Sequence, residues 1–209
     1  MPSPALSLTE SQRAALAKLG CGVEMAGGLL LLGGPPGVGK TTVLEHLAAA
    51  VGATGRRVEL LPAADWLATR SDLPGLVLAD DAHLADEGEL ASLLIRCQTG
   101  QPPATLVLSG QGRLLTLAGR DRRLAEATRL RVALLPASRS ETAVVLPQPA
   151  GPPWSEAVID RLHEIAAGIP AACRRLAELA LVVAASRPDG QLTPDDIEAI
   201  HRRLSPHAA

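Results

Sequence analysis

The chain is almost without aromatic side chains: its 209 residues include two Trp and no Phe or Tyr. Because 47% of the residues are nevertheless hydrophobic, the core must be built from Leu, Val, Ala and Ile. Stacking of nucleic-acid bases on aromatic rings is nearly excluded as a mode of binding. With 20% charged residues, the composition is that of an ordinary globular protein.

Cysteines and long apolar runs are also scarce. Cys21, Cys97 and Cys173 are widely spaced and include no Cys-x-x-Cys pair, which argues against a disulfide framework or a zinc site. The longest apolar stretches, such as 179–185, are far shorter than the roughly 20 residues of a membrane-spanning helix. The N-terminus also lacks the basic segment of a signal peptide. We therefore expect a cytoplasmic protein with no membrane span.

Short apolar runs alternate with amphipathic stretches over the first two thirds of the chain. A helix is expected at 9–25, where Thr9 and Gln12 have the spacing of a capping box. Strands are then predicted at 29–32, 58–61, 76–79, 105–109 and 130–135. Helices are predicted after GGPPGVGKTT as far as residue 51, and at 63–69, 85–98 and 113–128. This alternation predicts an α/β fold with a parallel sheet and helices on both faces.

From residue 137 the strand-like runs stop and only helical periodicity remains. Helices are predicted at 138–146, 154–167, 170–186 and 194–204, with a Pro/Gly-rich connector before the second. Thr193 and Pro194 suit the N-cap and first position of the last helix. We expect a nucleotide-binding α/β domain at 1–137 and a small helical lid at 138–209.

The segment 34–41, GPPGVGKT, matches the pattern G-x-x-x-x-G-K-[ST] without deviation and lies between a predicted strand and a predicted helix. Glycines allow backbone N–H groups to turn toward phosphate oxygens, and the helix N-terminus adds its positive dipole end. Lys40 is expected to reach the β- and γ-phosphates, and Thr41 to ligate Mg²⁺. The predicted phosphate contacts are Gly34, Pro35, Pro36, Gly37, Val38, Gly39, Lys40, Thr41 and Thr42.

The segment 76–81, LVLADD, is an apolar strand that ends in two carboxylates. After a phosphate-binding loop this pattern favours a Walker B motif, in which Asp80 would hold the magnesium through water. Asp81 stands where many ATPases have a Glu that polarises the attacking water. Because the Asp side chain is one methylene shorter than Glu, we expect slow hydrolysis. The alternative is that Asp81 caps the following segment. For His83 we favour a carboxylate partner or loop residue over a catalytic role.

Two further groups suggest contact with a nucleotide. Ser109 and Gln111 follow the strand at 105–108, where a polar side chain would face the γ-phosphate, although an ordinary strand-end turn has the same pattern. Between residues 113 and 131, six arginines stand against two acidic residues in a chain of formal charge −2. They would supply an arginine finger for a neighbour's ATP site, a patch for DNA phosphates, or a solvated helix face.

These motifs together resemble the AAA+ ATPases, and within them the ExeA-like and TniB-like group associated with secretion and transposition. GPPGVGKTT, LVLADDAHL, LVLSGQGRL, RLRVALLPASRSET and GIPAACRRLAELAL carry the resemblance over nearly the whole chain. It implies the AAA+ strand order, a helical lid and ATP in the cleft between them. It makes Arg129 the favoured finger, ahead of Arg120 and Arg123. Ala171 stands where the family has its lid arginine; either Arg174, one turn further, substitutes for it, or the sensor is absent.

Other classes share parts of these motifs. DDAHLAD also resembles signalling NTPases of the STAND type, and GPPGVGKTT also resembles small nucleotide or metabolite kinases. The sequence argues against a GTPase, because the N-K-x-D motif of a GTPase needs a lysine outside the loop, and the one such lysine, Lys18, lies in AKLG. We expect an ATP-dependent switch or weak ATPase that forms a homo-oligomer with ATP and acts on a protein or DNA partner.

Overall fold

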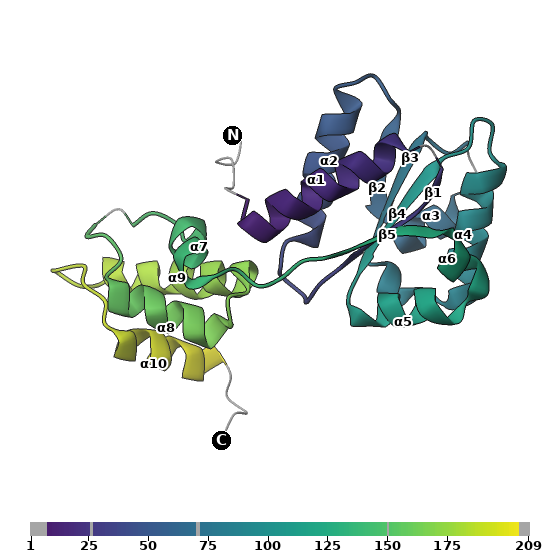
Figure 1. Cartoon of the computed structure of the whole chain (residues 1–209). Coiled ribbons are helices and arrows are strands. Elements are labelled where there is room, and N and C mark those ends of the chain that lie inside the picture. Colours follow the sequence, from purple (N-terminus) through teal and green to yellow (C-terminus); the bar gives the residue numbers. More distant parts are fainter. Residues whose placement is uncertain (1–7, 26, 70–71, 150, 205–209) are drawn as a thin grey trace. The chain divides into compact units, whose positions relative to one another are not determined.

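The computed structural model describes residues 8–25, 27–69, 72–149 and 151–204 (Figure 1). The contacts between residues group the chain into two compact units. One is Ser11–Leu135, the α/β unit; the other, the helical unit, contains the described residues from 136 onward together with residues 8–10. Each unit is a separate body with its own core.

The α/β unit contains a five-stranded parallel sheet in the order β2-β3-β4-β1-β5. This confirms the predicted fold class, a parallel sheet flanked by helices. β1 is paired on both sides, with Leu31 opposite Leu108 of β4 and Arg131 of β5. The strands are β1 (Gly28–Gly33), β2 (Val58–Pro62), β3 (Leu76–Asp80), β4 (Thr105–Gly110) and β5 (Thr128–Ala133).

Helices cover both faces of this sheet (Figure 1). Side chains alternate along β1, so that Leu30 and Leu32 pack toward α1 (Glu10–Glu24) and α2 (Lys40–Gly52). Leu29 and Leu31 pack toward the other face, which is covered by α3 (Ala63–Ala68), α4 (Glu87–Thr99), α5 (Gly112–Arg120) and α6 (Arg122–Ala127). Burial on both faces explains why β1, β3 and β4 are nearly continuous apolar runs.

The main departures from the expected elements are local. A short 3-10 helix, η1 (Ala82–Leu84), follows β3 and was not predicted. The predicted helix at 113–128 is two helices, α5 and α6, because Asp121 interrupts it: its carboxylate accepts hydrogen bonds from the backbone N–H groups of Arg123 and Leu124, at 2.8 and 3.1 Å. Such a side-chain cap begins a new helix.

The helical unit contains the four predicted helices, α7 (Arg139–Val145), α8 (Glu156–Ala166), α9 (Pro170–Ala185) and α10 (Pro194–Leu204). Leu162, Cys173 and Ile197 are fully buried in its core. Ser138 and Glu141 form a capping box at the start of α7. Pro194 is the first residue of α10, as expected. In neither unit does the described chain have a helix that is both long and apolar enough to cross a membrane.

Candidate nucleotide-binding site

Loop 34–41 connects β1 to α2 at the carboxyl end of the sheet, and its glycines are required by its conformation. Gly37 and Gly39 have φ of 76° and 98°, a region that other residues rarely adopt. A Cβ at Gly39 would lie 2.1 Å from Gln12 Nε2. That amide comes from α1 and donates a hydrogen bond to the Val38 carbonyl at 2.9 Å. Gln12, for which the sequence suggested only helix capping, therefore fixes the loop.

Lys40 is the first residue of α2, and only 8% of it is exposed. Its Nζ donates hydrogen bonds to the carbonyls of Gly34 and Pro35, both at 3.0 Å. Burial lowers the pKa of Lys40 because it disfavours the charged ammonium, while the carboxylates of Asp80 and Asp81 act in the opposite direction. The ammonium therefore lies inside the loop, close to two acidic side chains.

Thr41 and Asp80 meet beside this lysine. The Thr41 hydroxyl donates a hydrogen bond to Asp80 Oδ2 at 2.5 Å, and the backbone N–H of Asp81 donates to Asp80 Oδ1 at 2.9 Å. The described residues contain no group of three or more His, Cys, Asp or Glu that could hold a metal by themselves. A hydroxyl and one carboxylate fit Mg²⁺, which in proteins usually takes one or two carboxylates together with substrate phosphates and water.

Asp81 differs from its neighbour in conformation and exposure. Its φ of 51° is left-handed, and its side chain is 59% exposed. It occupies the N-cap position of η1, but its carboxylate makes no capping hydrogen bond, so the structure does not support the cap as its role. Asp81 borders a cavity of about 330 Å³, which also includes Leu84 and Glu89. His83 Nδ1 lies 3.9 Å from Asp81 Oδ1, too far for a hydrogen bond, and this buried nitrogen has no hydrogen-bond partner among the described residues.

Ser109 and Gln111 lie on β4 and just after it, between the strands that carry the two motifs. Ser109 pairs with Leu32, and its hydroxyl is buried without a hydrogen-bond partner among the residues that the structure describes. Gly34 N–H donates to the Gly110 carbonyl at 3.2 Å, which joins loop 34–41 to the end of β4. Gln111 is half-buried at the N-cap of α5, and its side chain does not cap that helix.

Comparison with known proteins gives matches only at the level of structure: no protein-family model matches, and neither does any curated protein sequence. A Thermotoga maritima RuvB variant matches with a TM-score of 0.62 and 17% identity, over 94% of this chain and 69% of that one. Aeropyrum pernix ORC2 matches with a TM-score of 0.64 and 15% identity, over 100% and 69% of the two chains. The chain has the AAA+ P-loop NTPase fold.

A second pair of AAA+ structures extends this likeness. Aeropyrum pernix ORC1 in complex with DNA matches with a TM-score of 0.64 and 16% identity, over 96% of this chain and 66% of that one. Drosophila ORC bound to DNA matches with a TM-score of 0.63 and 12% identity, over 98% of this chain and 63% of that one. This chain therefore spans about two thirds of the length of these proteins. At such identities the likeness establishes the AAA+ fold alone.

The two arginines assigned from the AAA+ resemblance belong to different units of the structure. Arg129 is exposed at the start of β5, where its Nη1 donates to the Met25 carbonyl at 3.3 Å and its side chain lies against Gly28. That is the end of the sheet where β1 begins, whereas loop 34–41 follows the other end of β1. Arg174 belongs to α9 in the helical unit, and its Nε is buried without a partner among the described residues.

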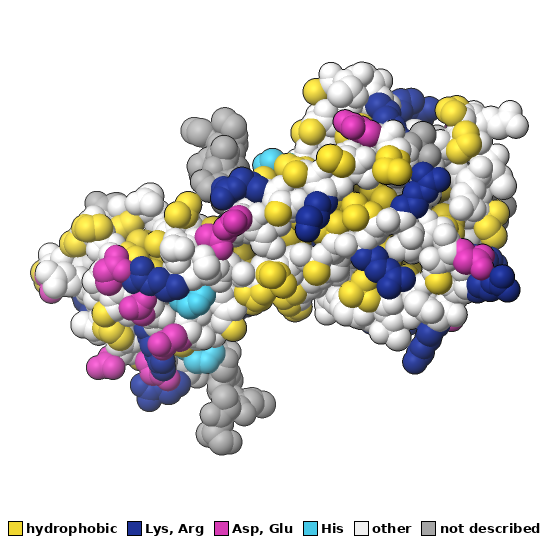
Figure 2. All heavy atoms as spheres, viewed as in Figure 1, with side chains coloured by type: hydrophobic (Ala, Val, Ile, Leu, Met, Phe, Trp, Pro, Cys, Tyr) yellow, Lys and Arg dark blue, Asp and Glu magenta, His cyan; other side chains and the backbone are white. Residues whose placement is uncertain are grey.

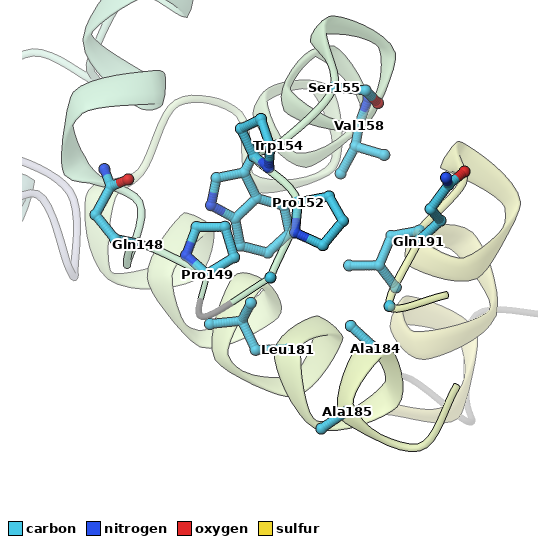
Figure 3. Close-up of a pocket in the computed structure, with 14 residues that line it drawn as sticks. Gln148, Pro149, Pro152, Trp154, Ser155, Val158, Leu181, Ala184, Ala185 and Gln191 are labelled. Atoms are coloured by element: carbon cyan, nitrogen blue, oxygen red, sulfur yellow. The ribbon is translucent and has the colours of Figure 1, made fainter. Parts of the chain in front are cut away.

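The helical unit has a cavity of its own, of about 400 Å³ (Figure 3). Pro149, Pro152 and Trp154 from the connector face Leu181 and Ala184 of α9 across it. The Trp154 indole N–H donates to the Pro147 carbonyl at 2.8 Å. Because none of the lining residues is charged, this cavity does not suit a triphosphate.

Proposed function

We propose that this chain binds ATP with Mg²⁺ and works as a nucleotide-dependent switch that hydrolyses ATP slowly. The observation that carries the proposal is the Thr41 to Asp80 hydrogen bond of 2.5 Å beside the buried Lys40. It brings together the hydroxyl, carboxylate and ammonium that Mg²⁺ and the β- and γ-phosphates require. Magnesium, when bound, would neutralise charge on the phosphates.

Each residue of the site has a proposed task. Residues 34–42 hold the phosphates, with Lys40 as their cation, and Thr41 and Asp80 hold the metal. Asp81 orients the attacking water, and its exposed carboxylate beside a cavity supports that role. Ser109 and Gln111 detect the γ-phosphate, because β4 carries them between β3 and β1. Residues 1–137 would form the nucleotide-binding domain and 138–209 the lid, from which Arg174 reaches the nucleotide.

The partner is a protein or DNA. Two structural neighbours of this chain support DNA as the partner, because ORC1 of Aeropyrum pernix and ORC of Drosophila were solved in complex with DNA. The resemblance to the ExeA-like and TniB-like group supports an accessory role in secretion or transposition, in the cytoplasm and as an ATP-dependent homo-oligomer. A switch of the STAND type and a small kinase are the alternative functions.

Measurement of phosphate release from ATP, with and without duplex DNA, tests the proposal. We expect slow release that needs Mg²⁺ and no acceptor molecule, and an increase when the partner is present. A kinase would instead transfer the phosphate to a nucleoside, a nucleotide or a small hydroxy compound, so an efficient acceptor in such a screen would overturn the proposal. A STAND-type switch would bind ATP tightly and release no phosphate under either condition.

A further inference from the structure

β5 is an edge strand with arginines along its exposed side. The sheet order places only β1 beside it, and within the described residues no strand pairs with its outer side. Leu130 and Val132 pack into the core, whereas Arg129 and Arg131 are exposed. α6 packs against β5 and against α5, so the arginines of 113–131 lie on connected elements. In Figure 2, basic side chains are spread over this side of the α/β unit and acidic ones are sparse.

The charge of this surface is only partly neutralised. Both acidic residues of segment 113–131 are already paired: Asp121 with Arg123 at 2.8 Å and Glu126 with Arg122 at 2.7 Å. Arg120 and Arg131 are exposed and have no carboxylate partner within the part of the chain that the structure describes. The segment carries a formal charge of +4, and the rest of the chain carries −6. The segment that forms α5, α6 and β5 is therefore positive, whereas the rest of the chain is negative.

We propose that this basic edge, made by α5, α6 and β5, binds the phosphate backbone of duplex DNA. The proposal deepens the proposed function and rests on its expectation of a DNA partner. Guanidinium groups match phosphate geometry and remain charged at any physiological pH. Both tryptophans are unsuited to base stacking here, since Trp66 is buried and Trp154 belongs to the helical unit. Binding should therefore be independent of base sequence and strongly dependent on salt.

The same arginines could instead protect the edge strand from association with another sheet, and this explanation predicts a different outcome when they are replaced. Proteins often place charged side chains on edge strands to prevent association with another sheet. If Arg131 serves only that purpose, its replacement promotes aggregation and leaves DNA binding unchanged. If the arginines contact phosphates, each one removed lowers the slope of log affinity against log salt by about 0.9.

The test uses the full chain without nucleotide and a fluorescent duplex of about 30 base pairs, followed by anisotropy at several salt concentrations. For Arg120→Gln with Arg131→Gln we expect a salt slope smaller by about two and an affinity roughly tenfold lower at low salt. The matched control, Arg202→Gln with Arg203→Gln, removes the same charge from exposed positions of α10 and should bind like the parent. Arg120→Lys with Arg131→Lys should retain most of the slope.

Equal slopes for the parent and the double glutamine variant would overturn the proposal, as would preferential binding of polyglutamate over DNA. Loss of binding in the α10 control would also overturn it, because a diffuse charge effect would then explain the data. The lysine variant separates loss of charge from misfolding. Because no ATP is present, a chain that fails to hydrolyse ATP still gives a clear result here.

Discussion

The Thr41 hydroxyl lies 2.5 Å from Asp80 Oδ2, although 39 positions separate the two residues. The strands that lead to them, β1 and β3, are not neighbours, because β4 lies between them. The contact therefore depends on the strand order and on the side-by-side carboxyl ends of parallel strands. In this type of sheet, ligands bind at the carboxyl ends, near the point where the strand order reverses. β1 and β4 form that point here.

Replacement of Lys40 should abolish ATP binding. Its ammonium is the only cation bonded within loop 34–41 among the described hydrogen bonds, and loss of a buried, charged hydrogen-bonding group typically costs roughly 2–5 kcal/mol of affinity. Lys40→Ala should therefore show no binding of Mg²⁺-ATP by titration calorimetry. Lys18→Ala is the matched control, since Lys18 is the other lysine of the chain and is exposed on α1. Equal affinity in the Lys40→Ala variant and the parent would contradict the proposed site.

Asp81 should control turnover without controlling affinity. Asp81→Asn should bind ATP like the parent but release phosphate more slowly, because the amide is a poor base. Asn also suits the left-handed backbone at this position, so the loop should keep its conformation. Asp81→Glu should preserve or raise turnover, since the longer side chain reaches the water more easily, at a stability cost of roughly 1–2 kcal/mol in the left-handed region.

Steady-state phosphate release and thermal unfolding measure these two effects separately. Asp65→Asn, at an exposed position of α3, is the control for loss of a negative charge. If Asp81→Asn hydrolyses ATP as fast as the parent, Asp81 does not act on the attacking water.

Local sequence patterns predicted the elements better than their contacts. Apolar runs located β1, β3 and β4, because burial on both faces removes polar residues from them. β2 and β5 also carry exposed charged side chains. The break at Asp121 was missed because helical periodicity continues through it, whereas the side chain of Asp121 caps a new helix. The left-handed backbone at Asp81 also leaves no periodic signal. It depends on the tight turn from β3 into η1, and Asp tolerates it better than most residues.

For the site as well, the local sequence pattern predicted the loop but not the contacts that hold it. The pattern of residues 34–41 predicted its loop, since the left-handed Gly37 and Gly39 belong to the motif itself. The role of Gln12 could not be predicted, because its bond to the Val38 carbonyl joins two elements 26 positions apart. The separation of Arg129 from loop 34–41 follows from the predicted parallel sheet, because Arg129 precedes a predicted strand whereas the loop follows one, and the pairing of β5 with β1 agrees with it.

The helical unit should lose stability in acid through one ion pair. Arg187 forms two hydrogen bonds with Asp196, at 2.7 and 2.5 Å, and the Asp196 side chain is 17% exposed. Hydrogen bonding from Arg187 lowers the pKa of Asp196 far below 3.8, with help from Thr193. This stabilisation is therefore present above pH 3.8 and is lost as the pH falls toward the pKa of the folded state.

Chemical denaturation of Arg187→Gln and the parent measures this contribution. The difference in their free energy of unfolding should be largest near pH 7 and should shrink as the pH falls below about 3. Arg175→Gln, at an exposed position of α9, should show no such dependence. A difference that stays constant over this pH range would mean that Arg187 acts through packing instead of charge.

Arg129 should complete the site of a neighbouring subunit. Arg129 is exposed at the end of the sheet where β1 begins, so a role in catalysis requires that it act on another chain. An arginine finger supplied in this way raises kcat by roughly 10³ to 10⁵. Arg129→Ala should therefore lose turnover while keeping ATP affinity, and the specific activity of the parent should rise with protein concentration.

Mixing two inactive variants tests this arrangement directly. Lys40→Ala lacks the phosphate-binding cation but keeps the finger, whereas Arg129→Ala keeps the cation and lacks the finger. In a mixed assembly, some interfaces join an intact loop from one chain to an intact finger from another, so part of the turnover should return. Two preparations of the same variant cannot form such an interface, and their mixture is the control. A protein that stays monomeric with ATP, with or without DNA, and shows no recovery on mixing would refute a finger acting between subunits.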